Sequence, residues 1–144
     1  MSMEILQTIS PTTNQPVITR NGVSATELNS MPSVAMDAFL RFSKTSLAER
    51  QTIVREALKI LGEKQDELAK ELTEQMGRPI AYTAKEITTA VKRGEYLLKI
   101  SNDALKDTDG EAEKGFKRYI QKAPIGPVLI LFAWNVSGIL HHVT

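Results

Sequence analysis

Apolar positions recur at steps of three and four residues through the middle of the chain, which is the pattern of amphipathic helices. The pattern predicts a first helix over residues 31–43, with Pro32 near its start, where a missing backbone N–H costs least. A second helix is predicted to begin after Ser46, because a serine followed three residues later by Glu49 forms a capping box. Residues 31–107 are therefore expected to be helical, apart from short breaks.

Glycines are expected to mark the breaks and a close contact in this helical region. Gly62 is expected to end or bend the second helix, and another helix follows it. Gly77 is expected to cap that third helix, with Pro79 in the first turn of the next one. The last helix is predicted over residues 80–105. Gly94 lies inside its apolar stripe, where a glycine weakens the helix and indicates the close approach of another element.

Strand patterns occupy the two ends of the chain. Residues 3–20 contain two short extended runs around prolines and an asparagine, which predicts a β-hairpin with a long loop. Residues 116–122 alternate and predict a half-buried or edge strand. The continuous apolar run at residues 128–132 is typical of a strand covered on both faces, as in a parallel sheet. The chain is thus expected to be mostly α-helical, with an N-terminal β-hairpin and one or two C-terminal strands.

Charge and hydropathy narrow the classes of function. The chain has 18 basic and 17 acidic residues, and a net charge of +1 gives no electrostatic reason to expect nucleic acid or a membrane surface as a partner. The longest apolar stretch, residues 128–134, is far shorter than the roughly 20 residues that span a bilayer. An acid stands near the N-terminus, where a signal peptide needs a basic start. We therefore expect a cytoplasmic protein that binds neither nucleic acid nor a membrane.

The sequence contains no cysteine, which excludes disulfides, zinc–thiolate sites and a cysteine nucleophile on this chain. His141 and His142 are adjacent, and adjacent residues on a strand point to opposite faces, so we expect no metal site there. Residues 107–111 resemble a calcium-binding loop only superficially, because the glycine comes too early for an EF-hand. We expect a solvated turn at that position.

Four blocks of sequence resemble the aldehyde dehydrogenase superfamily in both order and spacing. Residues 9–18 resemble the turn between strands that opens the family's members, and residues 47–50, Leu-Ala-Glu-Arg, resemble one of its helix starts. Residues 72–79, LTEQMGRP, resemble its Glu-x-Gly-Lys-Pro stretch. Residues 124–135, PIGPVLILFAWN, resemble its Pro-x-Gly, buried strand and Trp-Asn pair. The resemblance implies an α/β parent fold with a Rossmann-like NAD domain, a catalytic domain and a β arm for oligomerisation.

The resemblance also implies NAD(P)-dependent oxidation of aldehydes to carboxylic acids. In this family a cysteine thiolate attacks the aldehyde carbonyl, hydride passes to NAD or NADP, and water releases the acid. The asparagine of the Trp-Asn pair steadies the negative oxygen of the intermediate, and it corresponds to Asn135; losing such a donor costs about 3–4 kcal/mol. The residues that correspond to the cofactor's nicotinamide contacts are Leu131, Phe132, Ala133 and Trp134.

By the same resemblance, residues 1–144 are expected to be an N-terminal fragment of an aldehyde dehydrogenase. Residues 3–20 correspond to strands of the oligomerisation arm, and residues 116–135 to strands leading into the NAD-binding sheet. Ala133 stands where most members have proline, and residues 136–144 diverge from the Tyr-Pro or Phe-Pro and long helix that follow in the family. The family's nucleophilic cysteine and general-base glutamate come later than its Trp-Asn pair and have no counterpart here.

We therefore expect an incomplete, inactive fragment that does not bind NAD or NADP stably. The alternative is a non-catalytic helical interaction module that associates with a full-length dehydrogenase subunit, in a homo- or hetero-oligomer. An unrelated helical binding protein would require the four blocks to be coincidental.

Overall fold

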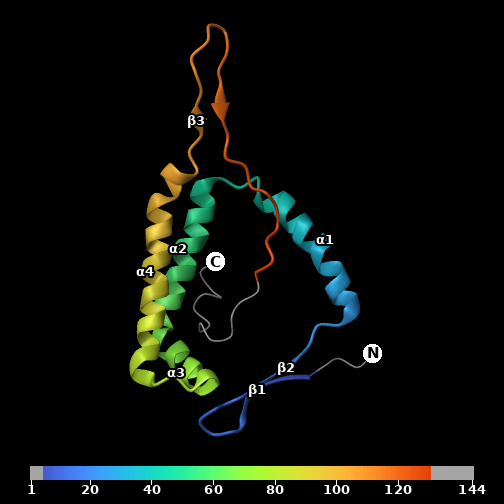
Figure 1. Ribbon diagram of the computed structural model, residues 1–144, viewed down its shortest axis with the longest axis vertical. Helices are drawn as coiled ribbons and strands as arrows, with labels where there is room; N and C mark the ends of the chain where they lie inside the picture. The colour runs from blue at the N-terminus through green and yellow to red at the C-terminus, as the bar shows by residue number, and fades with distance from the viewer. Residues whose placement is uncertain (1–4, 131–144) are drawn as a thin grey trace.

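The computed structural model describes residues 5–130, in which two small hairpins flank a run of helices (Figure 1). The second hairpin projects beyond the end of the last helix and away from the helical body. This confirms the mostly helical fold with an N-terminal hairpin and short C-terminal strands. In chain order the elements are β1 (Ile5–Ile9), β2 (Pro16–Asn21), α1 (Ala25–Phe42), α2 (Leu47–Glu63), α3 (Gln65–Met76), α4 (Ile80–Ala104), β3 (Thr108–Asp109) and β4 (Tyr119–Ile120).

The N-terminal hairpin forms as predicted. Strands β1 and β2 are antiparallel, and Ile5 pairs with Asn21 at the open end. In the connecting loop the Ser10 N–H donates to the Gln15 carbonyl at 2.9 Å. Asn14 has a φ of 55°, the left-handed conformation that asparagine tolerates better than most residues. The loop chemistry inferred from the sequence therefore accounts for the turn.

Helix α1 begins at Ala25, so the predicted start at residue 31 was wrong. Ser24 is the N-cap: its hydroxyl accepts a hydrogen bond from the Glu27 N–H at 3.2 Å, and the Ser24 N–H donates to Glu27 Oε2 at 2.9 Å. A capping box of the same kind was correctly predicted at the start of α2. The box at Ser24 lies one helix earlier in the chain. Pro32 lies inside α1 rather than in its first turn, because the helix starts upstream of it.

Both capping boxes should make the helical content depend on pH. The pKa of Glu27 lies below its ordinary value of 4.5 chiefly because the Ser24 side chain hydrogen-bonds the carboxylate. The pKa of Glu49 is lowered chiefly by the Ser46 backbone N–H, which donates to Oε2 at 2.7 Å. A carboxyl group whose pKa is lower in the folded chain than in the unfolded chain stabilises the fold. This stabilisation is fully present at a pH above the unfolded pKa. That stability is lost as the pH falls from 4.5 through the folded pKa.

We expect Glu49→Gln to lose less helix than the parent chain on acidification below pH 4.5, measured by circular dichroism. Glutamine keeps an oxygen that accepts the Ser46 N–H but has no proton to gain. Glu56→Gln, a substitution in the same helix outside its capping box, is the control. A Glu49→Gln titration identical to that of the parent would contradict the assignment.

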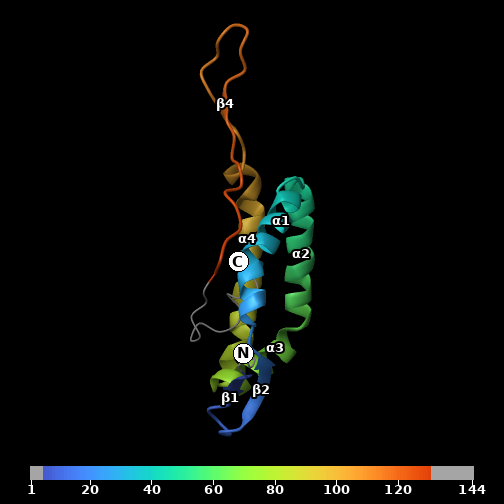
Figure 2. The ribbon, with the colours of Figure 1, turned by 90° about the vertical axis from the view of Figure 1, so that its right-hand side faces the viewer.

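Helices α2, α3 and α4 form the packed body of the molecule, with α4 in contact with both others (Figures 1 and 2). The core cluster combines Leu61 of α2, Ala69 of α3, and Ile87 and Ala90 of α4. Next to it, a Cβ added to Gly94 of α4 would lie 2.5 Å from Leu58 Cδ2 of α2. The close approach predicted at this glycine is therefore confirmed.

The remaining helix boundaries lie close to the positions predicted from the glycines and from Pro79. Helix α2 ends at Glu63, one residue after Gly62, and α3 ends at Met76. Gly77 caps α3 with a φ of 69°, a conformation that glycine adopts without steric penalty. Pro79 precedes the first residue of α4 and so occupies its N-cap rather than its first turn. Among residues 5–130, none of the helices combines the length and the hydropathy that a membrane-spanning helix requires.

The C-terminal segments depart from the sequence pattern. The strand predicted at residues 116–122 is reduced to β4, which pairs with β3. Strand β3 lies where a solvated turn was expected. Residues 128–130 of the predicted buried strand have no strand pairing within residues 5–130, and Val128 and Leu129 are exposed. Residues 131 and 132 lie outside the described residues, so the predicted strand stays a prediction. A β-strand requires hydrogen bonds to a neighbour, and no strand within residues 5–130 pairs with this segment.

Candidate functional site

The predicted oxyanion-hole residue, Asn135, and the predicted nicotinamide contacts at residues 131–134 lie outside the described part of the chain. The same holds for His141 and His142. The assignments of these residues therefore stay predictions. Three other blocks of the resemblance, residues 9–18, 47–50 and 72–79, lie within the described residues.

Two of those blocks meet at the tip of the N-terminal hairpin. A Cβ on Gly77 would lie 2.7 Å from Pro11 Cγ and 3.8 Å from Thr12 Oγ1. Ser10 is buried at the base of the loop, and its hydroxyl accepts a hydrogen bond from the Thr12 N–H at 3.3 Å. A glycine is therefore required at position 77 both by its positive φ and by the contact of α3's end with the hairpin. This contact joins residues 9–18 to residues 72–79.

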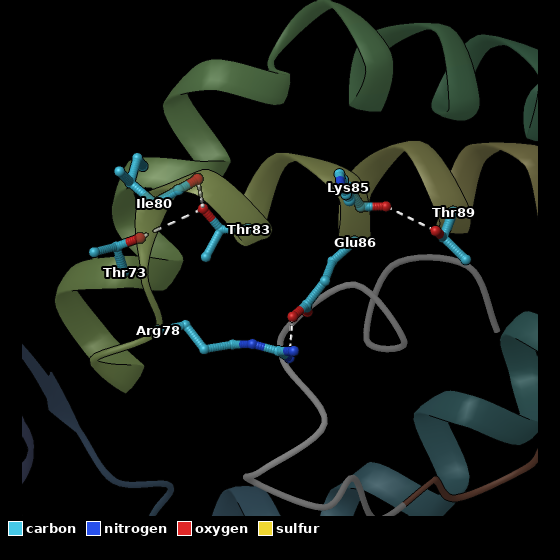
Figure 3. Close-up of polar contacts among 7 residues, drawn as sticks. All are labelled: Thr73, Arg78, Ile80, Thr83, Lys85, Glu86 and Thr89. Carbon is cyan, nitrogen blue, oxygen red and sulfur yellow. Dashed lines mark hydrogen bonds and ion pairs between the residues drawn. The ribbon is translucent and has the colours of Figure 1, made fainter.

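A corner of polar side chains follows directly between α3 and α4 (Figure 3). Thr83 is fully buried, and its hydroxyl donates to the Ile80 carbonyl at 3.0 Å. The hydroxyl oxygens of Thr73 and Thr83 lie 3.4 Å apart, so the Thr73 hydroxyl can donate to the Thr83 oxygen across the two helices. This pairing joins α3 to α4 at the end where the two helices meet.

An ion pair joins the linker between α3 and α4 to helix α4. The Arg78 side chain extends along α4 from the linker, and its guanidinium pairs with Glu86 Oε1 (Figure 3). The Glu86 side chain is mostly buried, and within residues 5–130 that oxygen has no other hydrogen-bond partner. A partly buried carboxylate costs more to leave unpaired than an exposed one. The pair therefore ties the linker to the second turn of α4.

A second polar contact joins α2 to the far end of α4. The Gln51 side-chain amide donates to Ser101 Oγ at 2.7 Å and to Asn102 Oδ1 at 3.1 Å. Sequence reasoning did not identify Gln51, Arg78 or Glu86 as structurally important. Arg78 and Glu86 lie on the two sides of a helix start, and Gln51 is 50 residues from Ser101. Contacts of this kind leave no local pattern in the sequence, so the sequence could not have revealed them.

The polar contacts described above position the helices relative to one another. None of them joins a nucleophile to a base within residues 5–130. Within the described range, no three histidine or acidic side chains are grouped so as to hold a metal ion. The two carboxyl groups with lowered pKa values, Glu27 and Glu49, are helix caps. The polar contacts described for residues 5–130 are therefore contacts that hold the helices and the N-terminal hairpin together.

Comparison with known proteins identifies what this scaffold belongs to. The model of the aldehyde dehydrogenase family matches residues 1–142. The chain belongs to the aldehyde dehydrogenase family. The four resembling blocks are therefore not coincidental, and an unrelated helical binding protein is excluded.

Two relatives show how much of an aldehyde dehydrogenase the match covers. The chain is 30% identical over 138 residues to a probable succinate-semialdehyde dehydrogenase [NADP(+)] of Synechocystis sp., covering 90% of this chain and 28% of that protein. It is 25% identical over 138 residues to the N-succinylglutamate 5-semialdehyde dehydrogenase of Pseudomonas fluorescens, covering 94% and 28% respectively. The chain thus spans little more than a quarter of the length of these curated relatives.

Solved structures show the same fold. The chain superposes on PnpE in complex with nicotinamide adenine dinucleotide with a TM-score of 0.75 at 20% identity, covering 85% of this chain and 25% of PnpE. Succinic semialdehyde dehydrogenase from Streptococcus pyogenes, solved with NADP+, gives a TM-score of 0.68 at 24% identity, covering 78% and 25%. At these identities the likeness establishes the aldehyde dehydrogenase fold of the segment.

Proposed function

We propose that these 144 residues form the N-terminal part of an NAD(P)-dependent aldehyde dehydrogenase and do not oxidise aldehydes by themselves. The observation that carries this proposal is the family match over residues 1–142 in a sequence without a single cysteine. Aldehyde oxidation in the family begins with the attack of a thiolate, and a serine or threonine hydroxyl is a weak nucleophile without an adjacent base. The chain can therefore contribute binding surface but not the covalent step.

In this proposal Asn135 supplies the oxyanion donor and residues 131–134 line the nicotinamide end of NAD or NADP. A carboxamide N–H₂ is a neutral donor that needs no change of protonation as charge develops on the substrate oxygen. Residues 3–20 contribute to the oligomerisation arm, and residues 116–135 lead into the cofactor sheet. Support comes from the Trp-Asn motif and from the order of the four blocks.

For the whole protein, the names of the relatives favour a semialdehyde as the substrate class. The alternative function is that of a non-catalytic helical module that associates with a full-length dehydrogenase subunit in a homo- or hetero-oligomer. The exposed apolar side chains of α1 favour it, since they provide a surface for such a partner.

The test is a turnover assay on the purified 144-residue chain with succinate semialdehyde and either NAD+ or NADP+, followed by nicotinamide fluorescence. We expect no reduced cofactor above the enzyme-free blank, while the Synechocystis relative, as positive control, produces it in the same assay. Turnover by the chain that survives repurification would overturn the proposal, because it would need a nucleophile other than cysteine.

A further inference from the structure

Asn21 is followed by a glycine at the point where β2 ends. Asn21 is the last residue of β2 and is exposed, and Gly22 belongs to no strand or helix. A short linker then leads to Ser24, the N-cap of α1 (Figure 1). An asparagine side chain reaches the backbone N–H groups that follow it, and glycine has no Cβ to obstruct the approach. The pair therefore meets the steric requirement for a reaction between the Asn21 side chain and the Gly22 backbone nitrogen.

This reaction needs only the chain, a base from the solvent and water. After losing its proton, the Gly22 nitrogen attacks Cγ of Asn21, and the bond from Cγ to the side-chain nitrogen breaks to release ammonia. The product is a five-membered succinimide, which water opens at one of its two carbonyls. Opening at Cγ gives aspartate, and opening at the former backbone carbonyl gives isoaspartate. Two groups held within reach of each other react far faster than the same groups in free solution.

The structure distinguishes Asn21 from the other described asparagines. Asn29 and Asn102 lie inside α1 and α4, where the N–H of the next residue is hydrogen-bonded along the helix. Asn14 lies in the exposed loop of the N-terminal hairpin, but Gln15 follows it, and the Gln15 side chain crowds the approach. Among residues 5–130, Asn21 alone combines exposure, an irregular backbone after it and a following glycine.

One other described glycine, Gly110, follows a residue of similar chemistry, Asp109. The Gly110 N–H donates to the Arg118 carbonyl at 2.9 Å, which holds this nitrogen in the hairpin of β3 and β4. Within residues 5–130 the Gly22 N–H has no backbone partner. The attacking nitrogen is therefore restrained at Gly110, and no backbone contact among the described residues restrains it at Gly22.

We propose that Asn21 is a site of spontaneous deamidation, which converts it to aspartate and isoaspartate without an enzyme. Either product adds one negative charge to the chain. Isoaspartate also adds one carbon atom to the backbone at the residue that pairs with Ile5, so the regular pairing of β1 with β2 ends earlier. The proposal does not depend on the proposed function, because it needs no substrate, cofactor or partner.

The test incubates the purified 144-residue chain at neutral and at mildly alkaline pH and follows each asparagine by mass spectrometry. Cleavage after glutamate releases residues 5–27 as one peptide, so Asn14 and Asn21 are compared in the same molecule. We expect Asn21 to react at least about tenfold faster than Asn14, because only Asn21 precedes a glycine. The reaction should be faster at the alkaline pH, since the attacking nitrogen must lose its proton. A methyltransferase specific for isoaspartate, with labelled S-adenosylmethionine, detects the isomer.

Gly22→Ala is the matched variant, because it keeps Asn21 and adds a single methyl group. We expect it to slow the reaction at Asn21 by at least about tenfold, with unchanged circular dichroism. The comparison of Asn21 with Asn14 in the parent chain does not depend on the folding of any variant. Equal rates at Asn14 and Asn21, or an unchanged rate in Gly22→Ala, would overturn the proposal.

Unfolding in guanidinium chloride tests the structural part of the argument. Asn102 should react at least about tenfold faster in the unfolded chain, because unfolding releases the helical N–H that follows it. Asn21 should change by less than about threefold, since the fold leaves it exposed. A large acceleration at Asn21 would show that the folded chain protects this residue, and it would overturn the proposal.

Discussion

Replacing Ile87 with alanine is expected to lower the free energy of unfolding by about 3 kcal/mol. Ile87 is 1% exposed and lies in the core cluster with Leu61, Ala69 and Ala90, where α2, α3 and α4 meet. The substitution removes three buried carbon atoms and leaves a cavity, because rigid helices do not collapse fully around the gap. Alanine's better helix propensity offsets only a few tenths of a kcal/mol of this loss.

The matched control is Ile53→Ala on α2, where the isoleucine is 56% exposed. We expect that variant to lose less than about 1 kcal/mol, since much of the side chain is already in water. Chemical denaturation followed by circular dichroism measures both values. Similar losses for the two variants would mean that the three helices do not pack around Ile87 as described.

Gly94→Leu is expected to destabilise the protein by about 2–3 kcal/mol, although leucine is a far better helix former than glycine. The added Cβ alone would lie 2.5 Å from Leu58 Cδ2 and 2.9 Å from Cδ1. Leu58 is buried, so it cannot swing into solvent, and α2 and α4 must separate to admit the new side chain. The same denaturation experiment measures the loss.

Gly62→Leu provides the control with the opposite sign. A Cβ at Gly62 has no neighbouring atom within 4 Å, so the variant gains helix propensity of about 0.5–1 kcal/mol without a clash. Adding Leu58→Ala to Gly94→Leu should restore part of the lost stability, because the smaller side chain makes room. If Gly94→Leu proves neutral on its own, the contact between α2 and α4 is looser than the structure indicates.

The helices could be predicted where a local signal fixed both their ends. The capping box at Ser46, the left-handed glycine at Gly77 and the apolar stripe of α4 are all visible within a few residues of sequence. Pro32 alone predicts a start of α1 at residue 31, whereas the capping box at Ser24 starts the helix at Ala25. The error shows that a complete cap outweighs a proline within the helix.

The strands and the site depended on information that a local pattern does not carry. Residues 128–130 have the composition of a buried strand, but strand formation requires a neighbour whose position no local rule supplies. The contact of Pro11 with Gly77 joins segments far apart in the chain. The ion pair of Arg78 with Glu86 needs the linker to turn back along α4. Family resemblance, rather than periodicity, supplied the predicted roles of Asn135 and residues 131–134.

The packing of α2, α3 and α4 has a consequence for how the polypeptide folds during synthesis. Within the described residues, the extensive contacts between helices all join positions in the stretch 47–104, and neighbouring helices are linked by short turns. All of these contacts close loops inside this one stretch of chain, so none of them needs a residue that follows α4. As the chain leaves the ribosome, this bundle can assemble before the residues that follow it have been translated. It would then offer a preformed surface on which later segments of a dehydrogenase could fold.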